Sequence, residues 1–194
     1  MFELQTKENQ KEFGAAVEEL KETLIGKFTD LEKKNSTLAL YRIFGYPQDR
    51  VDLLSELDPE KLLYYVKNNS NITYRLVIEK MPGFVKRKVE VIEVAHFKLA
   101  EMPGCCGVVI STGAFTEEKF RRRGIGTALN KFRMAIAKAV GYSTMMCTAV
   151  DDGITEKILA KNGWTRIGGF VNGRTDNSIS MYSVFLPIIT GKKT

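Results

Sequence analysis

The stretch from Phe120 to Leu129 reads F-R-R-R-G-I-G-T-A-L and joins two segments of different pattern. The residues before it, Gly107 to Phe115, are rich in β-branched side chains and predict a buried strand. The residues after it carry apolar side chains at helical spacing and predict a helix from Gly126 to Val140. The stretch is therefore a turn that leads from a strand into a helix.

The composition of this turn is typical of an anion-binding site. The first N–H groups of a helix lack partners, and the aligned peptide dipoles place about half a positive charge there. Gly124 and Gly126 carry no side chain in the path of a ligand, and Arg121 to Arg123 add cationic charge beside them. We expect the turn to hold phosphate oxygens. The alternative is a solvated basic turn.

Two better-known phosphate loops do not fit the turn. The loop G-x-x-x-x-G-K-[ST] requires a lysine after its last glycine, but Thr127 follows Gly126. The dinucleotide fingerprint requires a third glycine, but Leu129 stands at that place. A different phosphate-binding pattern is needed.

The pattern [Q/R]-x-x-G-x-[G/A] fits the turn at Arg121, Gly124 and Gly126. A later segment, K-I-L-A-K-N-G-W from Lys157 to Trp164, predicts a helix that ends in Gly plus an aromatic residue. Together these features resemble the GCN5-related N-acetyltransferases, the GNAT family, whose members carry acetyl-coenzyme A (acetyl-CoA). The resemblance covers Ile72 to Leu186. A softer resemblance, on G-C-C-G-V-V-I-S-T-G-A-F, is to GNAT proteins encoded by tailed bacteriophages.

The resemblance implies a fold and a cofactor site. The fold class is α/β (α+β), a mixed and mostly antiparallel sheet flanked by helices. The activity is transfer of an acetyl group from acetyl-CoA to a primary amine of a protein or small molecule. Strand backbone would hold the pantetheine arm and the acetyl group, and turn amides would hold the pyrophosphate. The implied cofactor-binding residues are Ala114, Phe115, Thr116, Arg121, Arg122, Arg123, Gly124, Ile125, Gly126 and Thr127.

The catalytic residues follow less directly. Glu93, His96 and Glu117 are candidates for the general base, although His96 could fill a polar core position and Glu117 could lie in a surface loop. The tyrosine that protonates the leaving thiolate in related enzymes is replaced by Leu159. Near Asp152, the family often has an asparagine against the cofactor arm. Asp151 and Asp152 could also only cap the next helix.

Composition limits the other possibilities. The chain has 194 residues, of which 44% are hydrophobic, so it can bury a core. No run of about 18 apolar residues occurs, and the first ten residues are too polar for a signal peptide, so we expect no membrane contact and a cytoplasmic protein, in the host cytoplasm if it is phage-encoded. The single histidine makes a metal site unexpected. Cys105, Cys106 and Cys147 indicate a reducing compartment and are expected as small core residues in strands.

The net charge of +6 is unevenly distributed. Residues 1–80 hold 12 Lys and Arg against 14 Asp and Glu, whereas residues 81–194 hold 17 against 9. The positive half contains the turn, as expected for an anionic ligand. A nucleic-acid-binding module is a second hypothesis, based on Lys86 to Lys88 and Arg121 to Arg123, but aromatic residues are not interleaved with these as stacking requires. A third is a non-catalytic CoA-binding protein, based on Leu159.

The remaining segments predict the rest of the architecture. We expect residues 1–35 to form a helical arm with an apolar stripe, which could pair with a second copy or dock on its own chain, and the resemblance implies a GNAT domain at residues 36–194. Ser36 to Tyr46 is a strand or a helix end. Asp49 to Lys67 predicts helix. Further strands are expected at Ile72–Lys80, Val89–Leu99, Tyr142–Val150, Thr165–Val171 and Ser178–Leu186, the first two as an antiparallel hairpin, with a helix at Ile154–Asn162.

Overall fold

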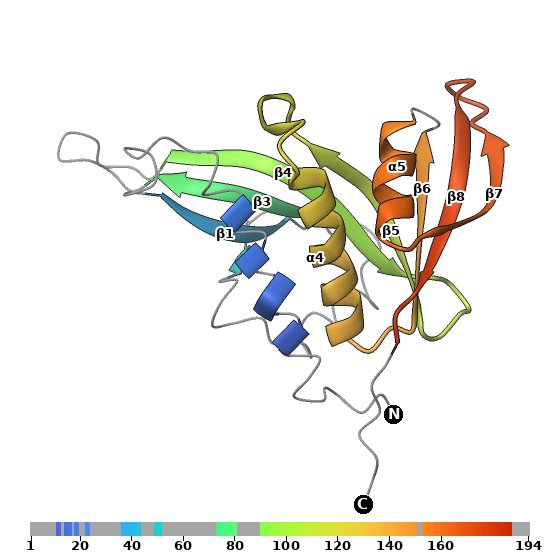
Figure 1. Cartoon of the computed structure of the whole chain (residues 1–194), viewed down its shortest axis with the longest axis horizontal. Helices are drawn as coiled ribbons and strands as arrows, with labels where there is room; N and C mark the ends of the chain where they lie inside the picture. The colour runs from blue at the N-terminus through green and yellow to red at the C-terminus, as the bar shows by residue number, and fades with distance from the viewer. Residues whose placement is uncertain are drawn as a thin grey trace, which may run out of the picture.

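The computed structural model describes residues 36–43, 49–51, 73–80, 90–150 and 153–187, and the helical residues 11–12, 14–16, 18–19 and 22–23. The strands form one sheet in the order β2-β1-β3-β4-β5-β6-β8-β7, with helices packed on it (Figure 1). The strands are β1 (Ser36–Ile43), β2 (Asp49–Val51), β3 (Thr73–Lys80), β4 (Glu90–Glu101), β5 (Val108–Thr116), β6 (Thr144–Val150), β7 (Thr165–Val171) and β8 (Ser178–Phe185). The helices are η1 (Glu118–Phe120), α4 (Ile125–Ala139) and α5 (Ile154–Lys161).

The sheet is mixed and mostly antiparallel, as predicted. Of its seven strand pairs, only β5 and β6 run parallel, because α4 carries the chain back across the sheet between them. Register shifts interrupt β4 on both sides, between Leu76 and Val77 against β3 and between His96 and Lys98 against β5. Such bulges bend a strand and re-aim its side chains.

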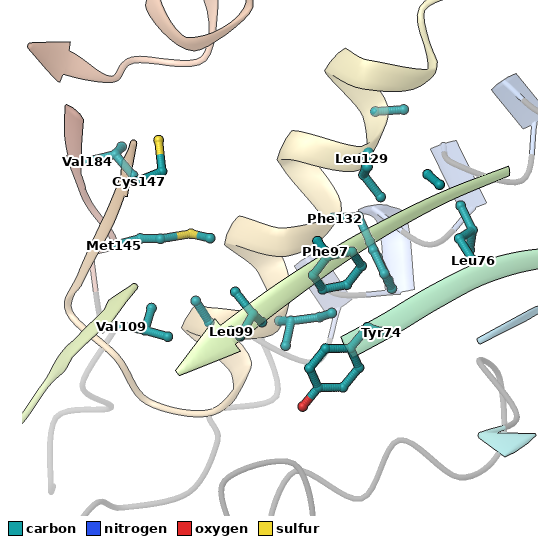
Figure 2. Packing of buried hydrophobic residues seen from close by; sticks show 14 of the residues in the cluster. Tyr74, Leu76, Phe97, Leu99, Val109, Leu129, Phe132, Met145, Cys147 and Val184 are labelled. Atoms are coloured by element: carbon teal, nitrogen blue, oxygen red, sulfur yellow. The ribbon is translucent and has the colours of Figure 1, made fainter. Parts of the chain in front are cut away.

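The core lies between the sheet and α4. Phe97 of β4 stacks on Tyr74 of β3 with ring centroids 5.3 Å apart, and it meets Phe132 of α4 edge to face at 6.1 Å (Figure 2). Leu129 and Leu99 are also buried in this cluster. The apolar residues of α4 thus fall on one face at helical spacing, and burying that face fixes the helix across β4 and β5.

Most of the predicted elements are confirmed. The helix predicted at Gly126–Val140 is α4, the helix predicted at Ile154–Asn162 is α5, and the hairpin of β3 and β4 is antiparallel. Ser36–Ile43, which the sequence left open, is a strand. The helix predicted from Asp49 was wrong at its start, because Asp49–Val51 pairs with β1 as β2. Residues 52–67 of that prediction lie outside the described residues.

The expectation for the cysteines was wrong in part. Cys147 is buried in β6 as expected, but Cys105 and Cys106 are exposed. They lie in the turn between β4 and β5, where Cys105 N–H donates to Met102 O at 3.0 Å. The Pro103-Gly104 pair ends the strand before the cysteines are reached, so they do not enter the sheet.

The described residues between 11 and 23, here called the N-terminal helical segment, lie beside α4 (Figure 1). Glu12 pairs with Lys138, and Glu19 pairs with Lys131 at 2.6 Å. The predicted apolar stripe of the arm, at positions 13, 17, 20, 24, 28 and 31, lies outside the described residues. None of the described helices is long and apolar enough to cross a membrane.

Candidate functional site

The two parallel strands separate part-way along their length. β5 pairs with β6 only from Val108 to Ser111, opposite Thr144 to Cys147. Beyond that point β5 continues to Thr116 and β6 to Val150 without pairing to each other. Residues 112–115 of β5 are exposed. One backbone edge of β5 is therefore left free to bond an extended ligand between the strands.

The arginine-rich turn lies at the open end of this separation. Gly124 caps α4 in the left-handed region at φ 82°, and Arg122 adopts a positive φ of 58°. Arg122, Arg123 and Gly124 are exposed, and the first amides of α4 follow them directly. The predicted phosphate site thus combines a free helix N-terminus with exposed cations.

The two glycines have different roles in the structure. Gly124 needs its positive φ, and a Cβ there would come no closer than 3.8 Å to Thr23 Cγ2. A Cβ on Gly126 would meet Ile158 Cδ1 at 3.3 Å, so this glycine lets α4 and α5 pack closely. The close packing accounts for the missing side chain at Gly126, and the expectation that its amide holds a phosphate oxygen stays a prediction.

A cavity of about 590 Å³ adjoins the turn. Its basic wall is formed by Arg123, Lys131 and Lys161, and Glu19 and Glu22 of the N-terminal helical segment face them from the other side. This volume falls within the range of small-molecule sites. The cavity brings together three exposed cations, from the turn, α4 and α5, and two acids from the N-terminal helical segment.

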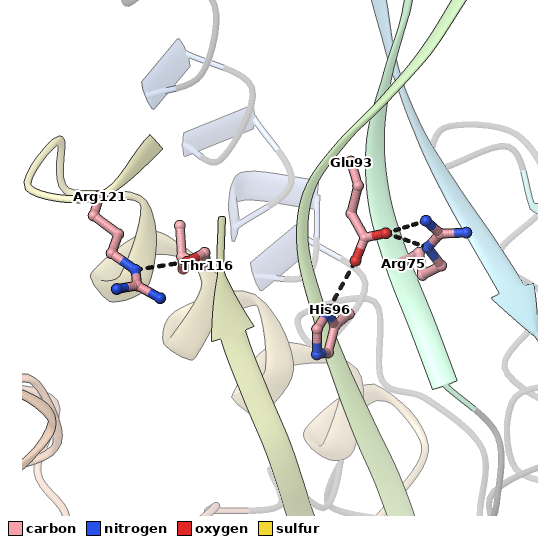
Figure 3. A network of polar contacts seen from close by, with 5 residues as sticks. All are labelled: Arg75, Glu93, His96, Thr116 and Arg121. Carbon is pink, nitrogen blue, oxygen red and sulfur yellow. Dashed lines mark hydrogen bonds and ion pairs between the residues drawn. The ribbon is translucent and has the colours of Figure 1, made fainter. Parts of the chain in front are cut away.

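The structure brings the three predicted catalytic residues together. The ligand atoms of Glu93, His96 and Glu117 all lie within 4.8 Å of one another. His96 Nδ1 lies 2.8 Å from Glu93 Oε1, and Arg75 of β3 pairs with Glu93 Oε2 (Figure 3). Glu117 N–H donates to Val94 O at 2.9 Å, which holds the end of β5 against β4. We call Arg75, Glu93, His96 and Glu117 the carboxylate–histidine cluster.

Charge and hydrogen bonding define the state of this cluster. Burial alone would raise the pKa of Glu93, but hydrogen bonds from Arg75 and His96 and their charges lower it overall. An ionised Glu93 can only accept a hydrogen bond, so Nδ1 of His96 donates, and in the neutral form of the ring Nε2 is the acceptor. His96 is one-third exposed, so Nε2 is open to a substrate proton. Two carboxylates and a histidine could also bind a metal ion, but Arg75 already neutralises Glu93.

Phe115 links the cluster to the turn. Its ring stacks on His96 at 5.3 Å and lies under the Arg121 guanidinium at 4.8 Å. Arg121 Nε also donates to Thr116 O at 2.9 Å (Figure 3). Arg121 therefore braces the end of β5, and of the three arginines in the turn Arg123 is the one that lines the cavity. Asp151 and Asp152 lie outside the described residues.

Sequence reasoning missed two residues of the site. Arg75 occupies a polar position in the alternating pattern of its strand, and that pattern does not distinguish an arginine from any other polar residue. Only the register of β3 against β4 places Arg75 opposite His96. Arg133 of α4 is 6% exposed, although its neighbour Lys131 is exposed. Its spacing from Leu129 and Ile136, at i+4 and i−3 on the apolar face, was the signal that could have identified a buried arginine.

Comparisons with known proteins give a likeness of fold. No family model and no curated protein matches the sequence. Among solved structures, the chain is similar to Ard1 from Thermoplasma volcanium (14% identity, 66% of this chain and 78% of that one, TM-score 0.48). It is also similar to the ribosomal-protein-S18-alanine N-acetyltransferase from Escherichia coli (10% identity, 70% of this chain and 81% of that one, TM-score 0.47). A third similar structure is the NatC complex bound to Gag peptide and CoA (12% identity, 59% of this chain and 71% of that one, TM-score 0.48). At these sequence identities the likeness concerns the fold alone and does not show an activity for this chain.

Proposed function

We propose that this chain is an N-acetyltransferase that moves the acetyl group of acetyl-CoA to a primary amine of a protein or a small molecule. The observation that carries the proposal is the separation of β5 and β6 directly below the arginine-rich turn. A thioester cosubstrate has a diphosphate end and an extended amide-containing arm. The turn suits the diphosphate end, and the free edge of β5 suits the amide-containing arm.

Each part of the proposed site has a defined task. The first amides of α4 and Arg123 hold the diphosphate. The backbone of Ala114, Phe115 and Thr116 bonds the arm and polarises the thioester carbonyl. Nε2 of His96 accepts a proton from the amine as its nitrogen bonds to the carbonyl carbon, and Glu93 stabilises the imidazolium that forms. Because Phe115 stacks on His96, the base and the carbonyl site share one wall.

The other expectations stay predictions of the sequence. These are the cytoplasmic location, the bacteriophage origin and the choice between a protein and a small-molecule acceptor. The nucleic-acid hypothesis also stays a prediction: Arg121 is engaged with Phe115 and Thr116, and residues 86–88 lie outside the described residues. A non-catalytic CoA-binding protein would share the turn but would not need the carboxylate–histidine cluster.

A thermal-shift titration with CoA tests the binding site. CoA should raise the melting temperature of the wild type, and Gly124→Glu should remove the effect because it places a carboxylate beside the diphosphate. Gly104→Glu is the matched control, because Gly104 also has a positive φ (75°) and open space around it, but lies at the far end of β5. Equal stabilisation of wild type and Gly124→Glu would refute the assignment of the turn.

An acetylation assay on the same proteins tests the chemistry. His96→Gln should bind CoA as the wild type does and acetylate amines about 10²- to 10⁴-fold more slowly, the range for loss of a general base. Full activity of His96→Gln would remove the histidine from the mechanism. CoA binding by the wild type without acetylation of any peptide or small amine would favour the non-catalytic alternative.

A further inference from the structure

The middle of α4 contains a buried cation with no anionic partner. Arg133 is 6% exposed, and its Nη1 and Nη2 donate to Ser111 Oγ and Asn130 Oδ1, each at 2.8 Å. Both partners are neutral and buried. Within the described part of the chain, no carboxylate pairs with Arg133, and its Nε has no hydrogen-bond partner. A buried charge is costly to a protein unless it is paired, so this arrangement calls for a reason.

Arg133 remains charged at neutral pH. Burial lowers the pKa of the guanidinium to about 10, which is still well above the pH of a cell. Cys147 does not neutralise it, because burial raises the pKa of that thiol to about 11, against the opposing effect of Arg133. The Arg133 site therefore holds an uncompensated positive charge.

This charge lies where β5 and β6 begin to separate. Ser111, which accepts a hydrogen bond from Arg133, is the last residue of β5 that pairs with β6, and its partner there is Cys147. We call Ser111, Cys147 and Arg133, which lie together where the pairing of β5 with β6 ends, the floor. An arm that begins at the turn and follows the free edge of β5 runs toward this floor, and a thioester held at Ala114 lies within about 10 Å of Ser111, at about 3.3 Å per residue.

The other titratable groups around the floor are already engaged. Tyr182 pairs with Cys147 from β8, and burial raises the pKa of its phenol, which also hydrogen-bonds Ser180 and Glu156 of α5. On α4 itself, Lys131 and Lys138 pair with Glu19 and Glu12 on the outer face of the helix. Among the described groups that face the floor, Arg133 is thus the cation available to an anion.

We propose that Arg133 provides the positive charge that stabilises the thiolate leaving the thioester, in place of a proton-donating tyrosine. The inference rests on the proposed acetyl transfer. The amine nitrogen bonds to the carbonyl carbon, the carbon–sulfur bond breaks, and its electron pair goes to sulfur. The amine proton goes to Nε2 of His96, and the thiolate later takes a proton from water. Leu159, at the place of the tyrosine in related enzymes, is an apolar core residue that is 2% exposed.

Arg133 acts as a positioning residue through Ser111. Because Ser111 Oγ accepts from Arg133, the hydroxyl hydrogen must point away from the guanidinium and can donate elsewhere. The charge itself also acts at a distance. A unit charge about 8 Å away, at an effective dielectric constant of about 20, lowers the pKa of a thiol by about 1.5. A lower thiol pKa makes a better leaving group.

The pKa of the CoA thiol, measured by the ultraviolet absorbance of the thiolate on the full-length protein, tests this inference. When CoA is bound to the wild type, the pKa of its thiol should be about 1.5 lower than the pKa of the thiol in free CoA. In Arg133→Met this pKa should equal or exceed that of free CoA, whereas Tyr182→Phe should keep the wild-type value. A purely structural arginine would not move this pKa. The acetylation rate of Arg133→Met should fall about 10- to 30-fold, with little change in the KM for acetyl-CoA.

The wild-type measurement is decisive even if a variant does not fold. If the pKa of the bound thiol equals or exceeds that of free CoA, the role of Arg133 is overturned while the proposed cofactor site remains intact. Failure of CoA to bind at all overturns the proposed function and this inference with it. As a second readout, the ratio of affinities for CoA and for an analogue without the sulfur should increase with pH in the wild type and stay constant in Arg133→Met.

Discussion

At the scale of single residues, the site depends on how one glutamate is held. Glu93 is bonded on one oxygen by Arg75 and on the other by His96, so its charge fixes the orientation of the imidazole. The sequence placed Glu93 and His96 among the candidate bases. It could not show that Arg75 joins them, because the contact crosses from β3 to β4 over 18 residues.

The Arg75–Glu93 contact gives a pH-dependent prediction. Arg75→Gln should lower the free energy of unfolding at pH 7 by about 1 kcal/mol, a value appropriate to a partly exposed ion pair. The pKa of Glu93 in the folded protein lies below its ordinary value of 4.5, so the stabilisation is complete above pH 4.5 and is lost as the pH falls through the folded pKa. Urea unfolding of the variant and wild type at several pH values measures the difference.

The difference between Arg75→Gln and wild type should therefore shrink below pH 4.5. Arg166→Gln is a suitable control, because Arg166 Nε donates to the neutral Ser180 hydroxyl and not to a carboxylate. A difference for Arg75→Gln that stays constant down to the pH of acid unfolding would show that the ion pair does not form in solution.

At the scale of elements, the N-terminal helical segment and α4 share the cavity beside the turn. Glu19 and Glu22 face Arg123, Lys131 and Lys161 across it. The segment therefore places negative charge where the phosphates of a cosubstrate are expected. Glu19 and Lys131 are both 46% exposed, so their ion pair is weak and can be broken by a ligand.

Removing the negative charges of Glu19 and Glu22 should tighten the binding of CoA. The double variant Glu19→Gln/Glu22→Gln is expected to bind CoA about 3- to 10-fold more tightly at low salt, because each acid repels the ligand by a few tenths of a kcal/mol to about 1 kcal/mol. Isothermal titration calorimetry measures the change, and raising the salt to about 1 M should remove most of it. Glu18→Gln, on the same segment but outside the cavity lining, is the control. Weaker binding by the double variant would mean that the segment helps to form the site.

At the scale of the whole molecule, the division into an arm at residues 1–35 and a domain at residues 36–194 stays a prediction. Within the described residues, ion pairs join the two parts at Glu12–Lys138 and Glu19–Lys131. Such pairs contribute about 0.2–1 kcal/mol each. β1 begins at Ser36 and pairs along its whole length with β3, so a chain that starts at Ser36 keeps the sheet.

A truncated protein that starts at Ser36 should fold, bind CoA and be monomeric. The expected dimerisation through the arm predicts that light scattering gives twice the chain mass for the full-length protein and one chain mass for the truncation. Identical masses would exclude the arm as a dimer contact. An insoluble truncation would instead show that the apolar stripe of the arm covers the domain.

The sequence by itself determined most of the elements of this protein and the location of its arginine-rich turn. Hydrophobic periodicity and the positions of Gly and Pro act over a few residues, so they could predict β5, the turn and α4 in order. The same local signals were not sufficient at Asp49–Val51, where pairing with β1 overrides a helical pattern.

Only the tertiary structure decided how these elements make a site. The register of β4, with a bulge on each side, brings Glu93, His96 and Glu117 within reach although they span 24 residues. The loss of pairing after Ser111 leaves one edge of β5 free, and packing against the sheet buries Arg133 beside Ser111. These features depend on strand pairing and burial between distant parts of the chain, and such contacts leave no periodic pattern in the sequence.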